Sequence, residues 1–465
     1  MRHPRPVGLM ERLFRVWDAA RAVGRLRGSM GRVERASRTE LLEIQRRLLR
    51  RMLEHAAGHS PFYAKLWSGL RASPEDFRSL PTVAKADLLD RGFDEALTDR
   101  SLSRRTLQPL LGSPRRGRHV VLATSGTTGE PVIVPYSRRE WIDGLAACLR
   151  GQARQVGGTF RLARLGRRVA AVATRNPIHA SAQIAASFDL REGSRLSLAA
   201  SAPIAEQVVA LNGFQPTLLA GYPSALAALA AEALEGRLRI APKAAFTGGE
   251  VVTRAARARL AEAWGIEIFD CYGLTETLLI AWECRLHHGL HLDEDRVIVE
   301  PVDAQGNPVA PGELSDHVLL TSLCQFTLPI LRYRVTDRMA IRDDPCPCGS
   351  PMARIVAIEG RRDETLSVRG LRGEAIELHA TAIETILEEV PGVRRFQIVK
   401  DQDPVVIRVV PREGAAGVAD ELRARLGKSL AAHQAAADAI RLEMVDRIDE
   451  AYGKTDKARK VIGGH

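Results

Sequence analysis

A loop of glycine and hydroxyl residues carries the clearest chemical signal in this chain. It lies between two short apolar runs, one ending at Ala123 and the other beginning at Val132, and this pattern predicts strand, loop, strand. Glycines let backbone N–H groups turn inward without a Cβ clash and hydroxyls add donors, so the loop could wrap phosphate oxygens. The candidate phosphate-binding residues are Ser125, Gly126, Thr127, Thr128 and Gly129. An ordinary polar hairpin loop is the alternative, and the absence of a Gly-Lys-Ser/Thr ending argues against a P-loop NTPase.

Thiol and imidazole side chains farther along the chain indicate a metal site. Cys284 and His291 are seven residues apart, and the knuckle Cys346-Pro347-Cys348-Gly349 begins 55 residues after His291. Two thiolates in a tight turn, together with a Cys/His pair, suit tetrahedral Zn²⁺ in a structural role. The spacing leaves four unrelated buried residues as the alternative. The histidines that compete for the fourth position are His287, His288 and His291.

Alternating helical and apolar segments between about residues 137 and 290 would position these groups. Strands are expected at Val169–Thr174, Thr217–Ala220, Ala244–Phe246 and Ile266–Phe269. Helices fit residues 138–153, 203–212, 224–235 and 253–264. Such alternation predicts an α/β fold with helices covering a parallel or mixed sheet, and ligands then gather at the carboxyl ends of the strands.

Three further regions complete the predicted organisation. Residues 1–110 are expected to form a mainly helical lead-in, and closely spaced β runs from about 295 to 360 predict a β-rich subdomain. After residue 361 the order strand, helix, strand, strand, helix, strand predicts a small α+β unit. We therefore expect a large N-terminal domain over 1–361 and a small C-terminal domain over 362–465.

Composition restricts the class of protein. The net charge of +11 comes mainly from arginines that are scattered along the chain, so the sequence argues against nucleic-acid binding and favours steering of anionic substrates. Charged residues occupy the N-terminus, where a signal peptide would need an apolar core, and no apolar run is long enough to span a bilayer. We therefore expect a cytoplasmic protein without a transmembrane segment.

Three more strings follow the glycine-rich loop, and together the four resemble the adenylate-forming superfamily over nearly the whole chain. The three are Asp270–Glu276, Leu331–Asp337 and Gly360–Asp363. The resemblance is closer to the phenylacetate-CoA ligase branch, which is also similar to enzymes that adenylylate a deazaflavin cofactor and to capsule-type adenylate-forming enzymes. The strings that carry the closer resemblance are Ser60–Tyr63, Leu80–Leu88, Gly221–Ser224, Gly248–Glu250, Glu283–His291 and Cys346–Gly349.

The resemblance implies an ATP site. Glu276 would hold Mg²⁺, Thr275 would contact the α-phosphate and Asp337 would accept hydrogen bonds from the ribose hydroxyls. Lys85 would approach the phosphates from the N-terminal segment. The other residues implied to bind ATP are Gly249, Glu250, Tyr272 and Arg361.

The resemblance also implies a catalytic lysine near the C-terminus. This lysine bridges the substrate carboxylate and ATP during adenylation, and it belongs to a mobile small domain that rotates before thioester formation. Lys457 matches it, although Asp456 stands where glycine is usual and Lys454 and Lys460 are close by.

The implied function is an ATP-dependent ligase that forms an acyl adenylate from a carboxylic acid. The acyl group would pass to CoA or to the phosphopantetheine thiol of an acyl carrier protein. Tyr136 and Trp141 follow the phosphate loop, where the phenylacetate branch places aromatic pocket residues, and they favour an aryl acid. Two other functions stay open: an adenylyltransferase or amide-forming ligase on the same fold, and a nucleotide-binding protein without turnover. A homodimer is a further candidate assembly.

Overall fold

A nine-stranded sheet forms the centre of the computed structural model, which describes residues 9–113, 119–124, 131–165, 167–361, 365–390, 392–400, 402–412, 414–432, 434–448 and 461–463. The strand order is β13-β14-β9-β8-β7-β6-β5-β3-β4. Strands β4, β3, β5, β6 and β7 run parallel, and β8, β9, β14 and β13 continue the sheet antiparallel. The bounds are β3 Val169–Ala173, β4 Arg195–Ala199, β5 Leu218–Gly221, β6 Ala244–Gly248, β7 Glu267–Leu274, β8 Leu278–Glu283, β9 Leu290–Leu292, β13 Asp337–Arg342 and β14 Arg354–Arg361.

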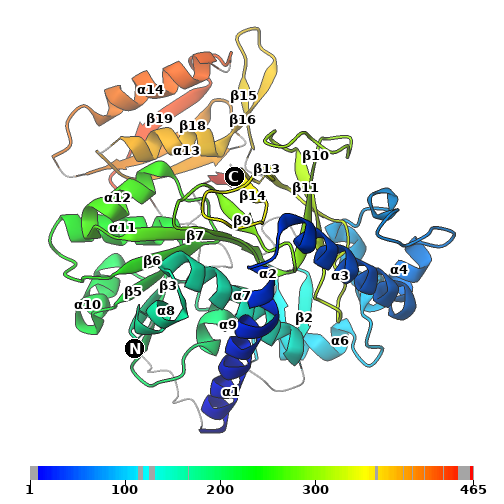
Figure 1. Ribbon diagram of the computed structural model, residues 1–465. Helices are drawn as coiled ribbons and strands as arrows, with labels where there is room; N and C mark the ends of the chain where they lie inside the picture. Colours follow the sequence, from blue (N-terminus) through cyan, green and yellow to red (C-terminus); the bar gives the residue numbers. More distant parts are fainter. Residues whose placement is uncertain are drawn as a thin grey trace.

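Helices cover both faces of the parallel strands (Figure 1). Because side chains alternate along a strand, Val172 and Leu219 pack into one apolar cluster with α10, α11 and α12, whereas Val169 and Leu218 pack on the opposite face with α7 and α8. Helix α9 also lies beside β3. The bounds are α7 Arg138–Val156, α8 Thr159–Leu165, α9 Ala180–Ser187, α10 Ile204–Phe214, α11 Pro223–Leu234 and α12 Arg254–Trp264. Among the described helices, none is both long and apolar enough to cross a membrane.

The N-terminal segment is mainly helical and packs on the large unit. Helix α3 starts at a reciprocal capping box between Ser37 and Glu40, and Tyr63 of α4 donates a hydrogen bond to the carbonyl of Pro329 at 3.0 Å. The bounds are α1 Leu9–Arg25, η1 Leu26–Met30, α2 Gly31–Val33, α3 Arg38–His59, α4 Pro61–Leu66, η2 Phe77–Ser79, η3 Lys85–Leu88, α5 Asp90–Ala96, α6 Arg104–Leu107 and η4 Gln108–Leu110.

Two small antiparallel sheets flank the large one. Strands β1 (His119–Ala123) and β2 (Ile133–Ser137) form the hairpin predicted around the glycine-rich loop. Strands β10 (Val297–Val302), β11 (His317–Ser322) and β12 (Tyr333–Val335) form a three-stranded sheet. The prediction of one β-rich subdomain up to residue 360 needs correction, because β13 and β14 join the large sheet through β9.

The residues after 365 form a small α+β unit with its own apolar core. This core includes Ile383, Ile398 and Leu422, and its buried members all lie between Leu366 and Ala439. The unit lies above α11 and α12 in Figure 1. Its elements are β15 Thr365–Arg369, β16 Ala375–His379, α13 Ala380–Glu389, β17 Val393–Lys400, β18 Val405–Pro411, α14 Val418–Ala432, β19 Ile440–Met444 and β20 Val461–Gly463. The sequence-based domain boundary at 361–362 stays a prediction.

Candidate active site and a Cys/His cluster

A cavity of about 2100 Å³ opens at the carboxyl ends of β3, β5, β6 and β7. Its lining includes residues that are far apart in the sequence, from Lys85 in the N-terminal segment to Lys400 in the C-terminal unit. Parallel strands end at the same edge of a sheet, so the loops that follow them converge. The cavity is therefore the candidate active site.

A carboxylate and a phenol meet on one wall of this cavity. Tyr272 lies on β7, and its hydroxyl donates a hydrogen bond to the carboxylate of Asp337 at the start of β13. Asp337 is only 5% exposed, yet it lines the cavity. The Asp337 carboxylate is thus held at the cavity wall by Tyr272, and a carboxylate can accept hydrogen bonds from two vicinal hydroxyls.

The loop between β7 and β8 contributes the second carboxylate. Glu276 is 9% exposed and lines the cavity, and the Tyr333 hydroxyl donates to its Oε1 over 3.4 Å. The preceding residue, Thr275, also lines the cavity, and its carbonyl accepts a hydrogen bond from Tyr136 at 2.6 Å. Thr275 and Glu276 therefore line the same cavity as Asp337.

A glycine turn after β6 forms another wall. Gly249 has a φ of +81°, which side-chain-bearing residues rarely adopt, and it lines the cavity together with Glu250. The carboxylate of Glu250 accepts a hydrogen bond from the backbone N–H of Ser224 at 3.1 Å. This contact joins the loop after β6 to the first turn of α11.

Lys85 enters the cavity from the N-terminal segment. The segment is hydrogen-bonded to β12, because the Val83 N–H donates to the Arg332 carbonyl at 3.0 Å and the Arg334 N–H donates to the Val83 carbonyl at 2.8 Å. Lys85 starts the following 3₁₀ helix and lines the cavity. The structure therefore brings together Lys85, Glu276 and Asp337, which the sequence separates by up to 252 positions.

Some predicted ATP-site residues fall outside the described parts of the chain. These are Lys457 and the loop residues Ser125, Gly126, Thr127, Thr128 and Gly129. Thr124, which borders the loop, lines the cavity. The backbone of Arg361 ends β14 and pairs with Asp337.

The predicted aromatic pocket residues require a correction. Tyr136 and Trp141 are each 3% exposed and are not among the described residues that line the cavity. The Tyr136 hydroxyl is committed to the Thr275 carbonyl, and the Trp141 Nε1–H donates to Ser187 Oγ at 3.2 Å. Burial raises the pKa of Tyr136 well above its ordinary value. Both rings pack in the core next to the N-terminal end of α7, behind the residues that line the cavity.

Three further cavity residues were not predicted from the sequence. His179 precedes α9, and Glu384 and Lys400 belong to the C-terminal unit. A histidine shortly after a predicted strand was the available signal for His179. No local pattern marks Glu384 or Lys400, because only the docking of the C-terminal unit brings them to the cavity.

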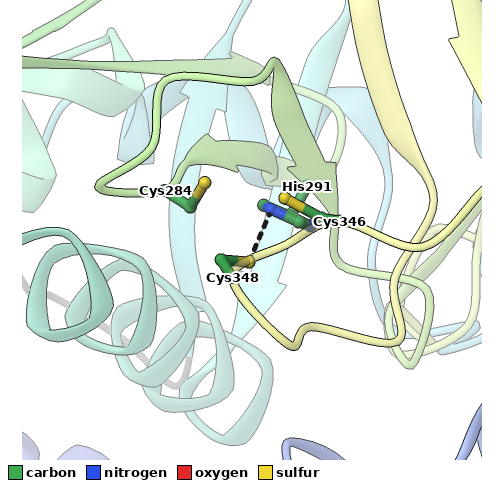
Figure 2. Close-up of side chains that lie close together, drawn as sticks. All are labelled: Cys284, His291, Cys346 and Cys348. Atoms are coloured by element: carbon green, nitrogen blue, oxygen red, sulfur yellow. Dashed lines mark hydrogen bonds between the residues drawn. The ribbon is translucent and has the colours of Figure 1, made fainter.

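Four potential metal ligands cluster at the other end of β8 (Figure 2). The ligand atoms of Cys284, His291, Cys346 and Cys348 all lie within 4.8 Å of one another. Cys284 follows β8, His291 lies on β9, and the two other cysteines come from the β13–β14 loop. His291 is fully buried, and Cys348 Sγ is 3.3 Å from its Nε2 atom. Three sulfurs and one nitrogen at this spacing fit tetrahedral Zn²⁺.

The two competing histidines point elsewhere. The Nδ1 atom of His287 is 3.1 Å from the Glu283 carboxylate, and its ring stacks on Phe269 with centroids 5.4 Å apart. His288 is exposed, and its carbonyl accepts a hydrogen bond from Arg354 at 2.8 Å. Among the described residues, His291 is therefore the histidine of the cluster.

The electrostatics of the cluster differ from thiol to thiol. Burial disfavours the Cys284 thiolate, but hydrogen bonds with His291 and with the backbone at Leu286 and His288 outweigh it and lower the pKa of Cys284 to about 6. Burial raises the pKa of Cys348 to about 12. Because the pKa of Cys348 is raised, the protein environment alone leaves the cluster incompletely ionised at neutral pH. A bound cation would favour the thiolate form of every cysteine ligand.

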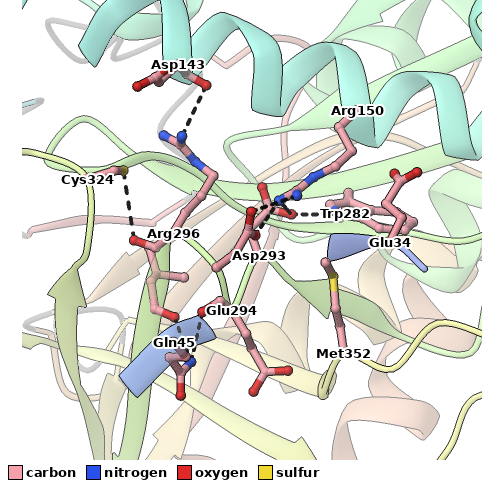
Figure 3. Close-up of polar contacts among 12 residues, drawn as sticks. Glu34, Gln45, Asp143, Arg150, Trp282, Asp293, Glu294, Arg296, Cys324 and Met352 are labelled. Carbon is pink, nitrogen blue, oxygen red and sulfur yellow. Dashed lines mark hydrogen bonds and ion pairs between the residues drawn. The ribbon is translucent and has the colours of Figure 1, made fainter. Parts of the chain in front are cut away.

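A buried ion network connects the strand of His291 to the helical layers (Figure 3). Arg150 of α7 is fully buried and binds Asp293 at 2.8 Å and Asp295 at 2.7 Å. Trp282 donates its indole N–H to Asp293 at 2.9 Å, and its ring lies 5.1 Å from that of His291. Gln45 of α3 donates to the Glu294 carbonyl at 2.9 Å. The network fixes the segment after β9 against α3 and α7.

Comparison with known proteins defines the class of this fold and site. Residues 87–314 match the family model described as AMP-binding enzyme, a range that includes the β1–β2 hairpin, β3 to β10 and Glu276. Together with the α/β architecture and the convergent cavity, this match indicates an AMP-binding domain over residues 87–314, and the predicted α/β class is confirmed.

Its relatives in this class include phenylacetate-CoA ligases. The chain is 25% identical to the phenylacetate-coenzyme A ligase of Aromatoleum evansii over 425 residues, covering 87% of this chain and 89% of the relative. It is 28% identical to the Escherichia coli K12 ligase of the same name over 369 residues, covering 73% and 75% respectively. The predicted resemblance to phenylacetate-CoA ligases is thereby confirmed.

A solved structure shares the fold across both units. A 2-hydroxyisobutyryl-CoA ligase in the postadenylation state superposes with a TM-score of 0.71 at 22% identity, over 90% of this chain and 89% of that one. An anthranilate CoA ligase superposes with a TM-score of 0.52 over 72% of this chain. At these identities the likeness shows the fold alone.

Proposed function

We propose that the protein is an AMP-forming acid–thiol ligase that converts a carboxylic acid and ATP into an acyl adenylate and pyrophosphate, and then transfers the acyl group to CoA. The observation that carries this proposal is the convergence of Lys85, Glu276 and the Tyr272–Asp337 pair on one cavity. A ligase needs all of these groups in one place, because the ribose must be held while the acid carboxylate attacks the α-phosphorus and pyrophosphate leaves.

Each wall of the cavity then has a role. Asp337 and Tyr272 hold the ribose, and the turn at Gly249 and Glu250 frames the adenine beside them. Thr275 contacts the α-phosphate, and Lys85 neutralises phosphate charge. These assignments are the ones that the family resemblance implies, and they are supported by the positions of the residues around the cavity and by their donor and acceptor chemistry.

Two metal ions complete the proposal. Glu276 offers a nearly buried carboxylate at the cavity wall, which is the hard oxygen ligand that Mg²⁺ prefers, and the ion would neutralise charge on the leaving pyrophosphate. The Cys/His cluster would hold Zn²⁺ in a structural role. None of its four ligands is among the cavity-lining residues, and a closed four-ligand site leaves no position for substrate.

The residues outside the described ranges keep their implied roles within this proposal. Ser125, Gly126, Thr127, Thr128 and Gly129 would cradle the phosphates, and Lys457 would bridge the acid and ATP during adenylation. CoA is the proposed acceptor because the relatives are named as CoA ligases. A carrier-protein thiol would use the same acyl adenylate.

The test measures the two half-reactions separately. Purified protein is incubated with ATP, Mg²⁺ and a panel of carboxylic acids, and pyrophosphate release is followed with and without CoA. We expect acid-dependent pyrophosphate release and CoA-dependent thioester formation. Adenylate formation without transfer to CoA, but with transfer to an amine or a carrier protein, would change the assigned acceptor. Absence of release with every acid would refute the ligase function.

A further inference from the structure

The active-site cavity continues along one face of the large sheet instead of ending at the strand termini. Its lining includes Val169 at the start of β3, Ala171 in the middle and Ala173 at the end. These alternate residues share one face, and four steps of about 3.3 Å give a length of about 13 Å. Leu218 and Ala220 of β5 extend the same wall.

The exposure of β3 shows that this face is open. β3 lies inside the sheet, between β4 and β5, where both faces of a strand are normally covered. On the face covered by α10 to α12, Ala170 and Val172 are fully buried. On the cavity face, Ala171 and Ala173 are only half-buried, whereas Val169 at the start of the strand is 5% exposed and packs with Leu218. Small side chains on this face leave space between the sheet and the helices above it.

The opposite wall of this extension contains an apolar strip, beside which Gln152 and Gln155 of α7 also line the cavity. The strip is contributed by Leu149 of α7, Leu162 of α8, and Ile184 and Phe188 from α9 and the residue that follows it. Each of the four is half-buried, although all lie beneath or between helices. At the far end, Arg195 donates its Nε–H to the Phe188 carbonyl at 2.8 Å and adds its methylene stem to the wall.

We propose that the acid activated by this enzyme has an extended apolar chain that lies along the β3–β5 face, from the adenylation centre towards Val169. This inference rests on the proposed ligase function. A compact aryl acid would occupy only the region near the strand termini and would leave the apolar extension without a ligand. A cavity of about 13 Å accommodates roughly ten chain carbons joined by bonds of about 1.5 Å in zigzag.

Acyl-chain length is the first test. Pyrophosphate release is measured with straight-chain saturated acids from propanoate to dodecanoate and with phenylacetate. Because each buried methylene favours binding, kcat/KM should rise by about twofold to fourfold per methylene up to roughly ten carbons and then level off or fall. A maximum at propanoate or phenylacetate, with no gain from longer chains, would overturn the inference while leaving the ligase function intact.

Two variants test the location. Ala171→Leu and Ala220→Leu place a larger side chain at the same level of the extension, because these two residues are register partners on β3 and β5. Each should lower kcat/KM for decanoate at least tenfold while leaving propanoate nearly unchanged, so the short acid also reports that the variant is folded. Ser197→Leu is the matched control, since Ser197 pairs with Ala171 from β4 but is exposed and does not line the cavity.

A binding measurement separates this inference from the ligase function. Decanoate binding to the full chain is measured by calorimetry without ATP, on the parent protein and on both variants. We expect binding to the parent and at least tenfold weaker binding to Ala171→Leu and Ala220→Leu. This result would support the extension even if no acid released pyrophosphate. Equal binding to all three proteins, or none to the parent, would overturn it.

Discussion

The two ends of β8 carry two different kinds of site. Glu276 precedes the strand and faces a large cavity, whereas Cys284 follows it and faces three other ligands within 4.8 Å. The first site leaves space for substrates, and the second closes on itself. Strand β8 therefore connects the candidate active site with the Cys/His cluster, to which we assign a structural role. Changes at the two ends should therefore separate activity from stability.

The largest expected effect on catalysis is at Glu276, which precedes β8 and lines the cavity. Glu276→Ala should lower acyl-adenylate formation by about two to three decades, because the carboxylate proposed to anchor Mg²⁺ is lost, and one preorganised electrostatic contact in such a site contributes roughly 3 to 4 kcal/mol. Acid-dependent pyrophosphate exchange measures the loss. The zinc content of the variant should be unchanged, and near-normal exchange would show that another carboxylate serves.

Lys457→Ala should separate the two half-reactions. The family resemblance implies that the unit carrying Lys457 rotates away after adenylation and that this lysine helps only the first step, so acyl-adenylate formation should slow by about two to three decades. Transfer from a supplied acyl adenylate to CoA should be nearly unchanged. Lys454→Ala and Lys460→Ala are the controls, and a large adenylation defect in either of them instead would shift the assignment.

Arg150→Met should destabilise the protein without touching the catalytic wall. It leaves Asp293 and Asp295 buried without their cation, and breaking such a pair costs about 3 to 5 kcal/mol. The matched control is Arg154→Met on the next turn of α7, where Arg154 is 44% exposed in its ion pair with Glu34 and removal should cost about 1 kcal/mol or less. Chemical denaturation of both variants measures the difference, and equal losses would contradict the assigned role of the network.

The Cys/His cluster that follows β8 should contain one zinc ion per chain. Cys346→Ser should remove most of the metal and lower the thermal midpoint, since a structural site contributes to folding directly. Metal analysis of protein purified without chelators measures this, with Cys324→Ala as the control because Cys324 lies outside the cluster. Well under one zinc in the parent protein would remove the zinc assignment.

The last prediction concerns the carboxyl group of Asp270, which lines the cavity. Asp270 lies on β7, and its burial, followed by the nearby Glu283 carboxylate, raises its pKa to about 8. Its protonated form is therefore favoured in the folded state, so its contribution to stability falls as pH rises from about 4 through 8. Asp270→Asn should reduce the loss of stability as the pH rises, because asparagine does not ionise. Thermal midpoints of both proteins from pH 5 to 8.5 test it, and parallel pH profiles would contradict the shift.

The sequence determined the elements whose signals are local. Apolar runs marked β3, β5, β6 and β7 to within a few residues, except for the carboxyl end of β7, and the helices α7, α10, α11 and α12 followed from their periodicity. The short strand β4 and the short helices α8 and α9 were missed, because five to eight residues give too little periodic signal. The three cysteines of the cluster were identifiable from their residue type and spacing, whereas the choice of His291 over His287 and His288 needed the structure.

Only the tertiary structure decided which side of each element faces a ligand. Tyr136 and Trp141 had the residue types of a substrate pocket, but packing at the start of α7 turned both into the core. Ala171 and Ala173 gave no signal in the sequence, because an alanine marks a cavity only when its neighbours leave the space open. Spacing along a chain fixes local conformation, whereas a cavity depends on side chains from strands and helices that meet only after folding.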